Sequence, residues 1–190
     1  MKHTPLNPRV QQLAHCLWQG GVIAYPTEAV WGLGCDPQDQ QAVERILALK
    51  QRSVSKGVIL VAASMEQVAE YLQDLTPAQW ETVRASWPGP NTWLIPDPHG
   101  RVPAWVRGRF NSVAIRVSAH PMVQALCQAF GGPIVSTSAN PQGKTPARQG
   151  WQVRRYFGDQ LDALAPGQVG RSAKPSQIRD LVTGALIRPG

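Results

Sequence analysis

The stretch from Val22 to Asp36 (VIAYPTEAVWGLGCD) constrains the fold of this chain most strongly. Its first apolar run is typical of a buried β-strand and ends at Pro26, which has no backbone N–H to donate to a sheet. Thr27 and Glu28 follow directly, before a second apolar run begins. One interpretation is a strand that delivers a hydroxyl and a carboxylate to a loop at its carboxyl end, where α/β sheets collect ligands. The alternative is a hairpin with a solvated glutamate.

The hydrophobic pattern of the whole chain predicts one α/β domain over residues 1–190, with some antiparallel pairing near the C-terminal end. Residues 96–111 are rich in Pro, Gly and Arg, and we expect them to form a mobile basic loop. The expected helices span 8–19, 36–50, 64–72, 78–87, 120–130 and 152–157. The expected strands span 22–25, 57–62, 92–95, 113–117, 133–135, 161–164, 178–182 and 185–188.

Composition excludes several classes of protein. No apolar run approaches the roughly 18 residues of a membrane helix, and the first nine residues lack the apolar core of a signal peptide. The three cysteines and four histidines are widely scattered, so we expect buried thiols in a reducing cytoplasm and no protein-held metal. The net charge of +7 suggests an anionic partner such as a nucleotide or a nucleic acid, although a merely basic surface would give the same balance.

The chain lacks the common signatures of nucleotide binding and covalent catalysis. It has neither G-x-x-x-x-G-K-[ST] nor G-x-S-x-G, and Gly32-x-Gly34 lacks the third glycine of a dinucleotide fingerprint. No serine or cysteine stands at a telling distance from a histidine. An enzyme of this sequence would therefore work by positioning and charge.

Four groups of polar residues remain as candidates for such a site. Lys50 and Arg52 lie at the end of a predicted helix, where they could also complement the helix dipole. Arg116 interrupts an apolar strand, where an unpaired charge would be costly. The third group follows a buried strand and reads Ser136-Thr137-Ser138-Ala139-Asn140, which suits either phosphate binding or helix capping. The last group, Ser176 and Arg188, lies in a tail that must dock to contribute.

Taken together, these groups resemble one family across residues 10–190. The runs YPTEAVWGLGCD, KQR, AIRVS, IVSTSAN, PSQIRD and a terminal IRPG occur in the same order, at similar spacing, in the YrdC/TsaC threonylcarbamoyl-AMP synthases. The resemblance implies a short, single-domain member with a twisted, open, mixed sheet flanked by helices and a basic concave surface. Longer family members append a second domain.

The resemblance also implies a reaction. The family condenses L-threonine, bicarbonate or CO2, and ATP into L-threonylcarbamoyladenylate and pyrophosphate, for N6-threonylcarbamoylation of adenosine 37 in tRNA. Mg²⁺ is expected to arrive with ATP, and no general base is obvious from the sequence. By analogy, ATP is held by Lys50, Arg52, Ser136, Ser138, Asn140, Arg188 and, as an addition outside the shared pattern, Lys56. Threonine or its carbamate is held by Thr27, Arg116, Thr137 and Ser176.

Outside these motifs the sequence leaves two questions open. One is whether tRNA binds directly or meets the product through a downstream transferase complex; the arginines that suit an RNA-facing surface, or only a solvated lid, are Arg101, Arg107, Arg109, Arg154 and Arg155. The other is the class of protein. A non-catalytic RNA-binding protein of tRNA or ribosome maturation, or a carbamoyl-adenylate-forming module of a larger carbamoyltransferase, would share part of the pattern.

Overall fold

The computed structural model describes residues 7–172 and 174–189. These residues form one mixed sheet of nine strands in the order β7-β1-β2-β6-β3-β5-β4-β8-β9. The strands are β1 (Ile23–Pro26), β2 (Trp31–Gly34), β3 (Ile59–Ala62), β4 (Asn91–Pro96), β5 (Ser112–Val117), β6 (Ile134–Ser138), β7 (Ala163–Leu164), β8 (Gln177–Asp180) and β9 (Leu186–Arg188). The α-helices are α1 (Pro8–Trp18), α2 (Gln40–Lys50), α3 (Pro77–Ser86), α4 (Ala104–Arg107), α5 (Pro121–Phe130) and α6 (Gly150–Phe157), and the 3₁₀ helices are η1 (Val54–Lys56), η2 (Glu66–Leu72) and η3 (Gly158–Gln160).

Capping side chains set where the helices begin. Thr76 and Gln79 form the capping box of α3, as the Thr76-Pro77 pair predicts. The second helix begins at Gln40 and not at 36–37, because Asp39 accepts the backbone N–H of Ala42. Residues 66–72 form the 3₁₀ helix η2, where we expected an α-helix.

The segment 96–111 corrects the expectation of a mobile loop. It contains helix α4, and Val102 and Val106 are buried in the core. Asp97 is also buried and accepts the backbone N–H groups of Arg101 and Val102, which fixes the turn before the helix. Apolar anchors and a buried carboxylate therefore order a stretch whose Pro, Gly and Arg content suggested mobility.

The stretch from Val22 to Asp36 combines features of both interpretations of its sequence, the hairpin and the strand that delivers a carboxylate. β1 and β2 are antiparallel and pair as a hairpin, with Pro26 opposite Trp31. The turn is closed by Thr27, whose hydroxyl donates to the carbonyl of Val30 (2.7 Å). The Glu28 side chain is only 14% exposed, so the solvated glutamate of the hairpin reading is wrong. The hairpin instead places a carboxylate inside the molecule.

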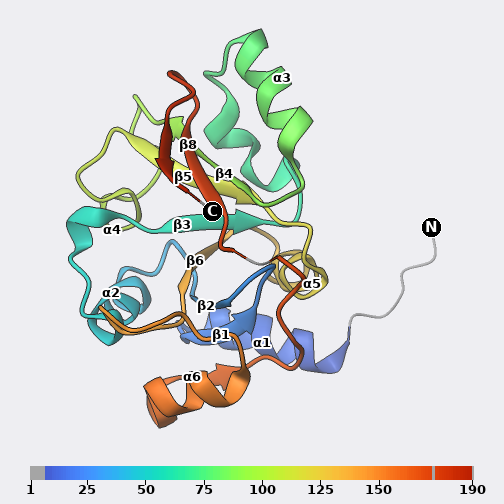
Figure 1. The fold of residues 1–190 in the computed structure, drawn as a ribbon, viewed down its shortest axis with the longest axis vertical. Coiled ribbons are helices and arrows are strands. Elements are labelled where there is room, and N and C mark those ends of the chain that lie inside the picture. Colours follow the sequence, from blue (N-terminus) through green and yellow to red (C-terminus); the bar gives the residue numbers. More distant parts are fainter. Residues whose placement is uncertain (1–6, 173, 190) are drawn as a thin grey trace.

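The two faces of the sheet are covered unequally, because successive residues of a strand point to opposite faces. Leu60 and Ile115 pack with residues of α2, η2, α3, α4 and α6 in the larger hydrophobic core. On the opposite face, Val61 and Ile134 pack with residues of α1 and α5 in a smaller core. In Figure 1, α1 and α5 lie together at one end of the sheet. In the part of the chain that the structure describes, no helix packs on the other end of that face.

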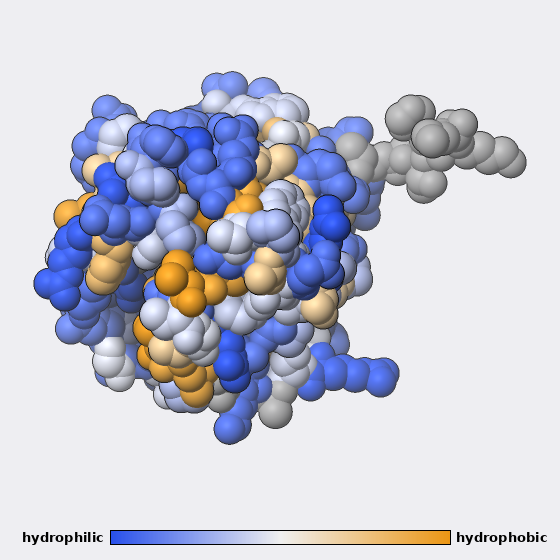
Figure 2. Space-filling model, turned by 90° about the horizontal axis from the view of Figure 1, so that it is seen from above, coloured by the Kyte–Doolittle hydropathy of each residue, from blue (hydrophilic) through white to orange (hydrophobic). Residues whose placement is uncertain are grey.

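The C-terminal hairpin, β8 and β9, forms one edge of the sheet beside β4. β8 pairs with β4 in parallel and β9 returns antiparallel to β8, which confirms the antiparallel pairing expected near the C-terminal end. In Figure 1 the red C-terminal segment passes in front of the sheet. Figure 2 shows a largely hydrophilic surface on the upper face, with apolar residues in a few separate patches. Among the described residues, no helix has the length and apolar character needed to cross a membrane.

Candidate active site

A pocket of about 390 Å³ lies over the uncovered end of the sheet. Arg116 points to this side because its neighbours Ile115 and Val117 belong to the larger core on the opposite face. The C-terminal segment also lines the pocket, through residues such as Ser176 and Arg188. The sequence-predicted residues that line it are Thr27, Arg52, Lys56, Arg116, Ser136, Thr137, Ser138, Ser176 and Arg188. Lys50 and Asn140 lie outside this lining.

Arg52 reaches the pocket because α2 ends abruptly. Gln51 takes a left-handed conformation (φ 53°), the one positive φ of a non-glycine residue among those described. The turn directs Arg52 away from the helix axis, and its guanidinium donates to the carbonyl of Gly57 (3.0 Å). Its Nε is buried without a hydrogen-bond partner, and burial lowers the pKa of the guanidinium. Arg52 therefore presents an underused cationic donor to the pocket.

Lys50 supports the pocket wall from behind. Its ammonium donates to the carbonyls of Ser138 and Asn140, the latter at 2.9 Å, and so ties the end of α2 to the loop after β6. The side chain is buried, and burial together with the neighbouring Arg52 lowers its pKa to about 8. The amide of Asn140 donates to Pro141 and Lys144, away from the lining.

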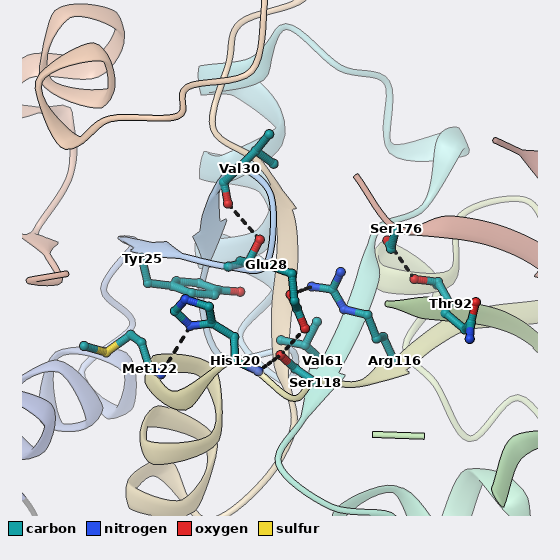
Figure 3. A network of polar contacts seen from close by, with 12 residues as sticks. Tyr25, Glu28, Val30, Val61, Thr92, Arg116, Ser118, His120, Met122 and Ser176 are labelled. Atoms are coloured by element: carbon teal, nitrogen blue, oxygen red, sulfur yellow. Dashed lines mark hydrogen bonds and ion pairs between the residues drawn. The ribbon is translucent and has the colours of Figure 1, made fainter. Parts of the chain in front are cut away.

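Glu28 and Arg116 form a buried pair of opposite charges at the base of the pocket. Figure 3 shows the guanidinium of Arg116 pointing at the Glu28 carboxylate, with Nη2 to Oε2 at 3.5 Å. The other carboxylate oxygen, Oε1, accepts the hydroxyl of Ser118 (2.7 Å). Both Glu28 Oε2 and Arg116 Nε are buried without a hydrogen-bond partner. Glu28 therefore offsets the free-energy cost of burying the charge of Arg116 inside an apolar strand. Two polar atoms of the pair still lack hydrogen-bond partners.

The C-terminal segment packs against β4 and brings Ser176 and Arg188 into the pocket. The hydroxyl of Ser176 meets that of Thr92 on β4 (3.1 Å), and Arg188 donates to the backbone carbonyl of Ser176 (2.9 Å). Although Arg188 is exposed as a whole residue, its pKa is lowered by burial of the guanidinium and by the nearby Arg116 and Arg52. The guanidinium groups of Arg52, Arg116 and Arg188 thus interact within one cavity, an arrangement that an anionic ligand would stabilise.

The five arginines expected on an RNA-facing surface lie in different environments. Arg101 pairs with Asp74 (2.5 Å), and Arg109 packs over the ring of Phe110. Arg107 lines the pocket and donates to the carbonyl of Phe110 (2.9 Å). Arg154 and Arg155 are exposed on α6 and are not among the pocket-lining residues. The five therefore differ in their contacts, and Arg107 is shared with the pocket.

Some residues in the pocket or next to it were absent from the sequence-based assignment. Glu28 was singled out in the first motif but received no role, and its signal was its position next to Thr27. Ser118, which binds Glu28, follows Arg116 by two residues and could have been found from that spacing. Phe110 and Lys174 gave no signal, because only the folded chain brings them to the cavity. Within residues 7–172 and 174–189, no three His, Cys, Asp or Glu side chains gather as metal ligands.

The fold and the pocket together define a class of protein. A half-covered mixed sheet carries a cavity with several guanidinium groups, a row of hydroxyls from β6 and one carboxylate. Planar guanidinium groups bind carboxylates and phosphates through paired hydrogen bonds, so this is an α/β protein built to bind anionic substrates.

Comparison with known proteins identifies the family. Residues 15–190 match the Sua5/YciO/YrdC family model, described as telomere recombination, and the chain belongs to that family. The chain is 57% identical over 184 residues to the threonylcarbamoyl-AMP synthase of Cellvibrio japonicus (97% of each chain) and 60% identical over 185 residues to that of Marinobacter nauticus (96% of this chain, 97% of the other). The structure of P. abyssi Sua5 complexed with L-threonine superimposes with a TM-score of 0.87 at 32% identity, over 95% of this chain. This chain spans 54% of that longer protein.

Proposed function

We propose that this chain is a threonylcarbamoyl-AMP synthase, which joins L-threonine, bicarbonate or CO2, and ATP to give L-threonylcarbamoyladenylate and pyrophosphate. The observation that carries the proposal is the convergence of Arg52, Arg116 and Arg188 on one cavity that also holds Glu28. The names of the relatives at 57% and 60% identity support the same reaction.

The pocket divides naturally between the two organic substrates. Arg116 and Thr27 lie beside Glu28 at the base, where a guanidinium suits the threonine carboxylate, and we place Ser176 and Thr137 on the same substrate. Arg52, Lys56 and Arg188, with the hydroxyls of Ser136 and Ser138, are placed on the ATP phosphates. The carbamate is an anion that attacks an anionic phosphate, so these cations lower the barrier by offsetting the negative charge that accumulates.

Lys50 and Asn140 take an indirect role in this proposal. Both lie outside the lining, and Lys50 holds the carbonyls at and after the end of β6. We propose that they position the hydroxyl row for ATP by fixing the loop that carries it. Mg²⁺ would be held chiefly by the phosphates of ATP, since Glu28 is the one carboxylate among the described pocket-lining residues.

The proposal extends to the cellular setting. We place the enzyme as a single domain in the cytoplasm, feeding N6-threonylcarbamoylation of tRNA either directly or through a downstream transferase complex. Exposed arginines such as Arg154 and Arg155 are available for phosphate contact with tRNA. The location and the tRNA partner extend the proposal, and the chemistry of adenylate formation is unchanged by them.

Pyrophosphate release from ATP by the purified protein tests the proposal. Threonine and bicarbonate are added and withheld in turn, and we expect release that requires both. Arg52→Ala should lose this activity, whereas Arg84→Ala, which removes an exposed arginine of α3, should keep it. Release that needs neither substrate, or no release while tRNA binds at physiological salt, would favour a non-catalytic RNA-binding protein. Release that requires carbamoyl phosphate would favour a carbamoyl-adenylate-forming module.

A further inference from the structure

The Glu28–Arg116 pair has free hydrogen-bonding capacity on both partners. The contact between Glu28 Oε2 and Arg116 Nη2 is 3.5 Å, longer than a close charge-assisted hydrogen bond. Glu28 Oε2 and Arg116 Nε are both buried without a hydrogen-bond partner, and both residues line the pocket. A buried carboxylate oxygen without a donor is costly unless a ligand supplies one.

Hydrogen-bond directions identify Oε2 as the oxygen available to a ligand. The hydroxyl of Ser118 accepts the backbone N–H of His120 (3.1 Å), so its own proton is free to donate to Glu28 Oε1. His120 Nδ1 accepts the N–H of Met122, which places the ring proton on Nε2, next to the carbonyl of Gln168. Figure 3 draws these contacts, which link His120 to Ser118 and Ser118 to Glu28. Oε1 is therefore occupied as an acceptor.

An amino acid carries an ammonium and a carboxylate on the same carbon, so its two binding partners must be neighbours. Glu28 and Arg116 meet this requirement, with opposite charges 3.5 Å apart on one pocket wall. We propose that Glu28 Oε2 accepts a hydrogen bond from the α-ammonium of the amino acid whose carboxylate binds Arg116, and takes up a proton from that nitrogen as it is carboxylated. This assignment rests on the proposed synthase function.

The proton transfer fits the stoichiometry of carbamate formation. Bicarbonate takes up one proton and loses water to give CO2. The ammonium nitrogen gives its first proton to Glu28 Oε2, uses the freed lone pair to form the C–N bond to CO2, and then loses a second proton. One of the two protons balances the dehydration of bicarbonate, and Glu28 returns the other to solvent. A positioned carboxylate of this kind is a general base.

Charged and titratable groups from several elements face the pocket around Glu28, among them Lys56, Arg107 and Lys174. Arg116 faces it from β5, Arg52 and Arg188 lie across the pocket, and the guanidinium groups stay charged at ordinary pH. Tyr25 on β1 and His120 before α5 lie on its other side (Figure 3), and burial raises the pKa of the Tyr25 hydroxyl. We therefore expect the threonine step to depend on pH through the substrate amine.

Calorimetric titration with two ligands tests the assignment. The ligands are L-threonine and 2,3-dihydroxybutanoate, which keeps the carboxylate and the side chain but has a hydroxyl in place of the ammonium. In Glu28→Gln the amide oxygen still accepts from Ser118, while an NH2 group replaces Oε2 and repels an ammonium. We expect threonine affinity to fall by about 10-fold or more and dihydroxybutanoate affinity to change by less than about 3-fold. Glu81→Gln, the same change on the exposed face of α3, should alter neither.

Turnover supplies the second readout. Glu28→Gln should lower kcat/KM for threonine by about 100-fold, and the deficit should shrink as rising pH neutralises free threonine. Equal losses for both ligands, or wild-type affinities in Glu28→Gln, would overturn the assignment while leaving the synthase function intact. If the wild-type protein binds no threonine, the synthase function fails as well. Should Glu28→Gln not fold, Glu28→Asp keeps the charge with a shorter reach, and a selective loss of threonine affinity remains the expected result.

Discussion

Replacing Lys50 by methionine should change the pH dependence of stability in a defined direction. Lys50 is buried, and its pKa in the folded chain lies near 8 instead of the usual 10.5. Because the folded-state pKa is depressed, the folded chain binds fewer protons than the unfolded chain between about pH 8 and pH 10.5. The contribution of Lys50 to stability therefore increases as pH rises through this window.

The size of the change in unfolding free energy follows from the shift in the pKa of Lys50. At neutral pH, holding the charged ammonium in the protein costs about 3 kcal/mol relative to the unfolded chain. Its two hydrogen bonds, to Ser138 and Asn140, offset this by about 1.5–3 kcal/mol each. The two hydrogen bonds together contribute about 3–6 kcal/mol, so Lys50→Met should cost about 0–3 kcal/mol at pH 7. Between pH 7 and pH 10 the wild-type protein should gain about 2–3 kcal/mol over the variant.

Urea unfolding of both proteins at pH 7, 8, 9 and 10 measures this difference directly. All other titrating groups are shared, so their contributions cancel when the two unfolding free energies are subtracted. Lys56→Met is a matched control, because Lys56 is an exposed lysine on η1. A difference between wild type and Lys50→Met that stays flat from pH 7 to pH 10, or that falls with pH, would refute the buried-ammonium argument.

Three further outcomes follow from the pocket. Arg52→Ala and Arg116→Ala should each reduce pyrophosphate release by at least about 100-fold while far-UV circular dichroism stays native; full activity in both would contradict the site assignment. Thr27→Val keeps the side-chain shape but loses the hydroxyl that closes the hairpin turn, and should raise KM for threonine more than KM for ATP; equal effects would argue against its role. Arg188→Ala removes a cation and the contact to Ser176, and should raise KM for ATP by about 10-fold in steady-state assays, with KM for threonine as the internal comparison.

Much of the architecture could be predicted because its signals are local. The helical spacing before Gly20 predicts α1, and the Thr76-Pro77 pair predicts the start of α3. The continuous apolar run at 57–62 predicts a strand buried on both faces, and β3 lies between β6 and β5 inside the sheet. The order of the motifs along the chain was also informative. It indicated the hydroxyl-bearing residues of β6 and the two cations at the end of α2 before any contact between them was known.

The misses come from contacts between distant residues. The segment 96–111 has a polar, breaker-rich composition, but Asp97 and Val106 anchor it to parts of the chain that composition does not specify. Lys50 looked like a ligand-binding cation from its position, and only the fold shows its ammonium turned to the carbonyls behind the wall. Lys50 and Arg52 share one sequence signal, but the left-handed turn at Gln51 lies between them and their side chains make different contacts.

The unequal coverage of the sheet explains why the pocket contains so many unsatisfied polar atoms. Apolar side chains on a sheet face must be covered by a helix to keep water out. On this face, α1 and α5 cover only the end that bears Val61 and Ile134. The remaining end carries Arg116 and Ser136, residues whose burial is tolerable only with polar partners. Glu28 supplies one such partner, and the C-terminal segment adds another cation, not an anion. The excess positive charge that remains is stabilised best by anionic substrates, so binding ATP and the amino acid carboxylate completes a layer that the helices leave open.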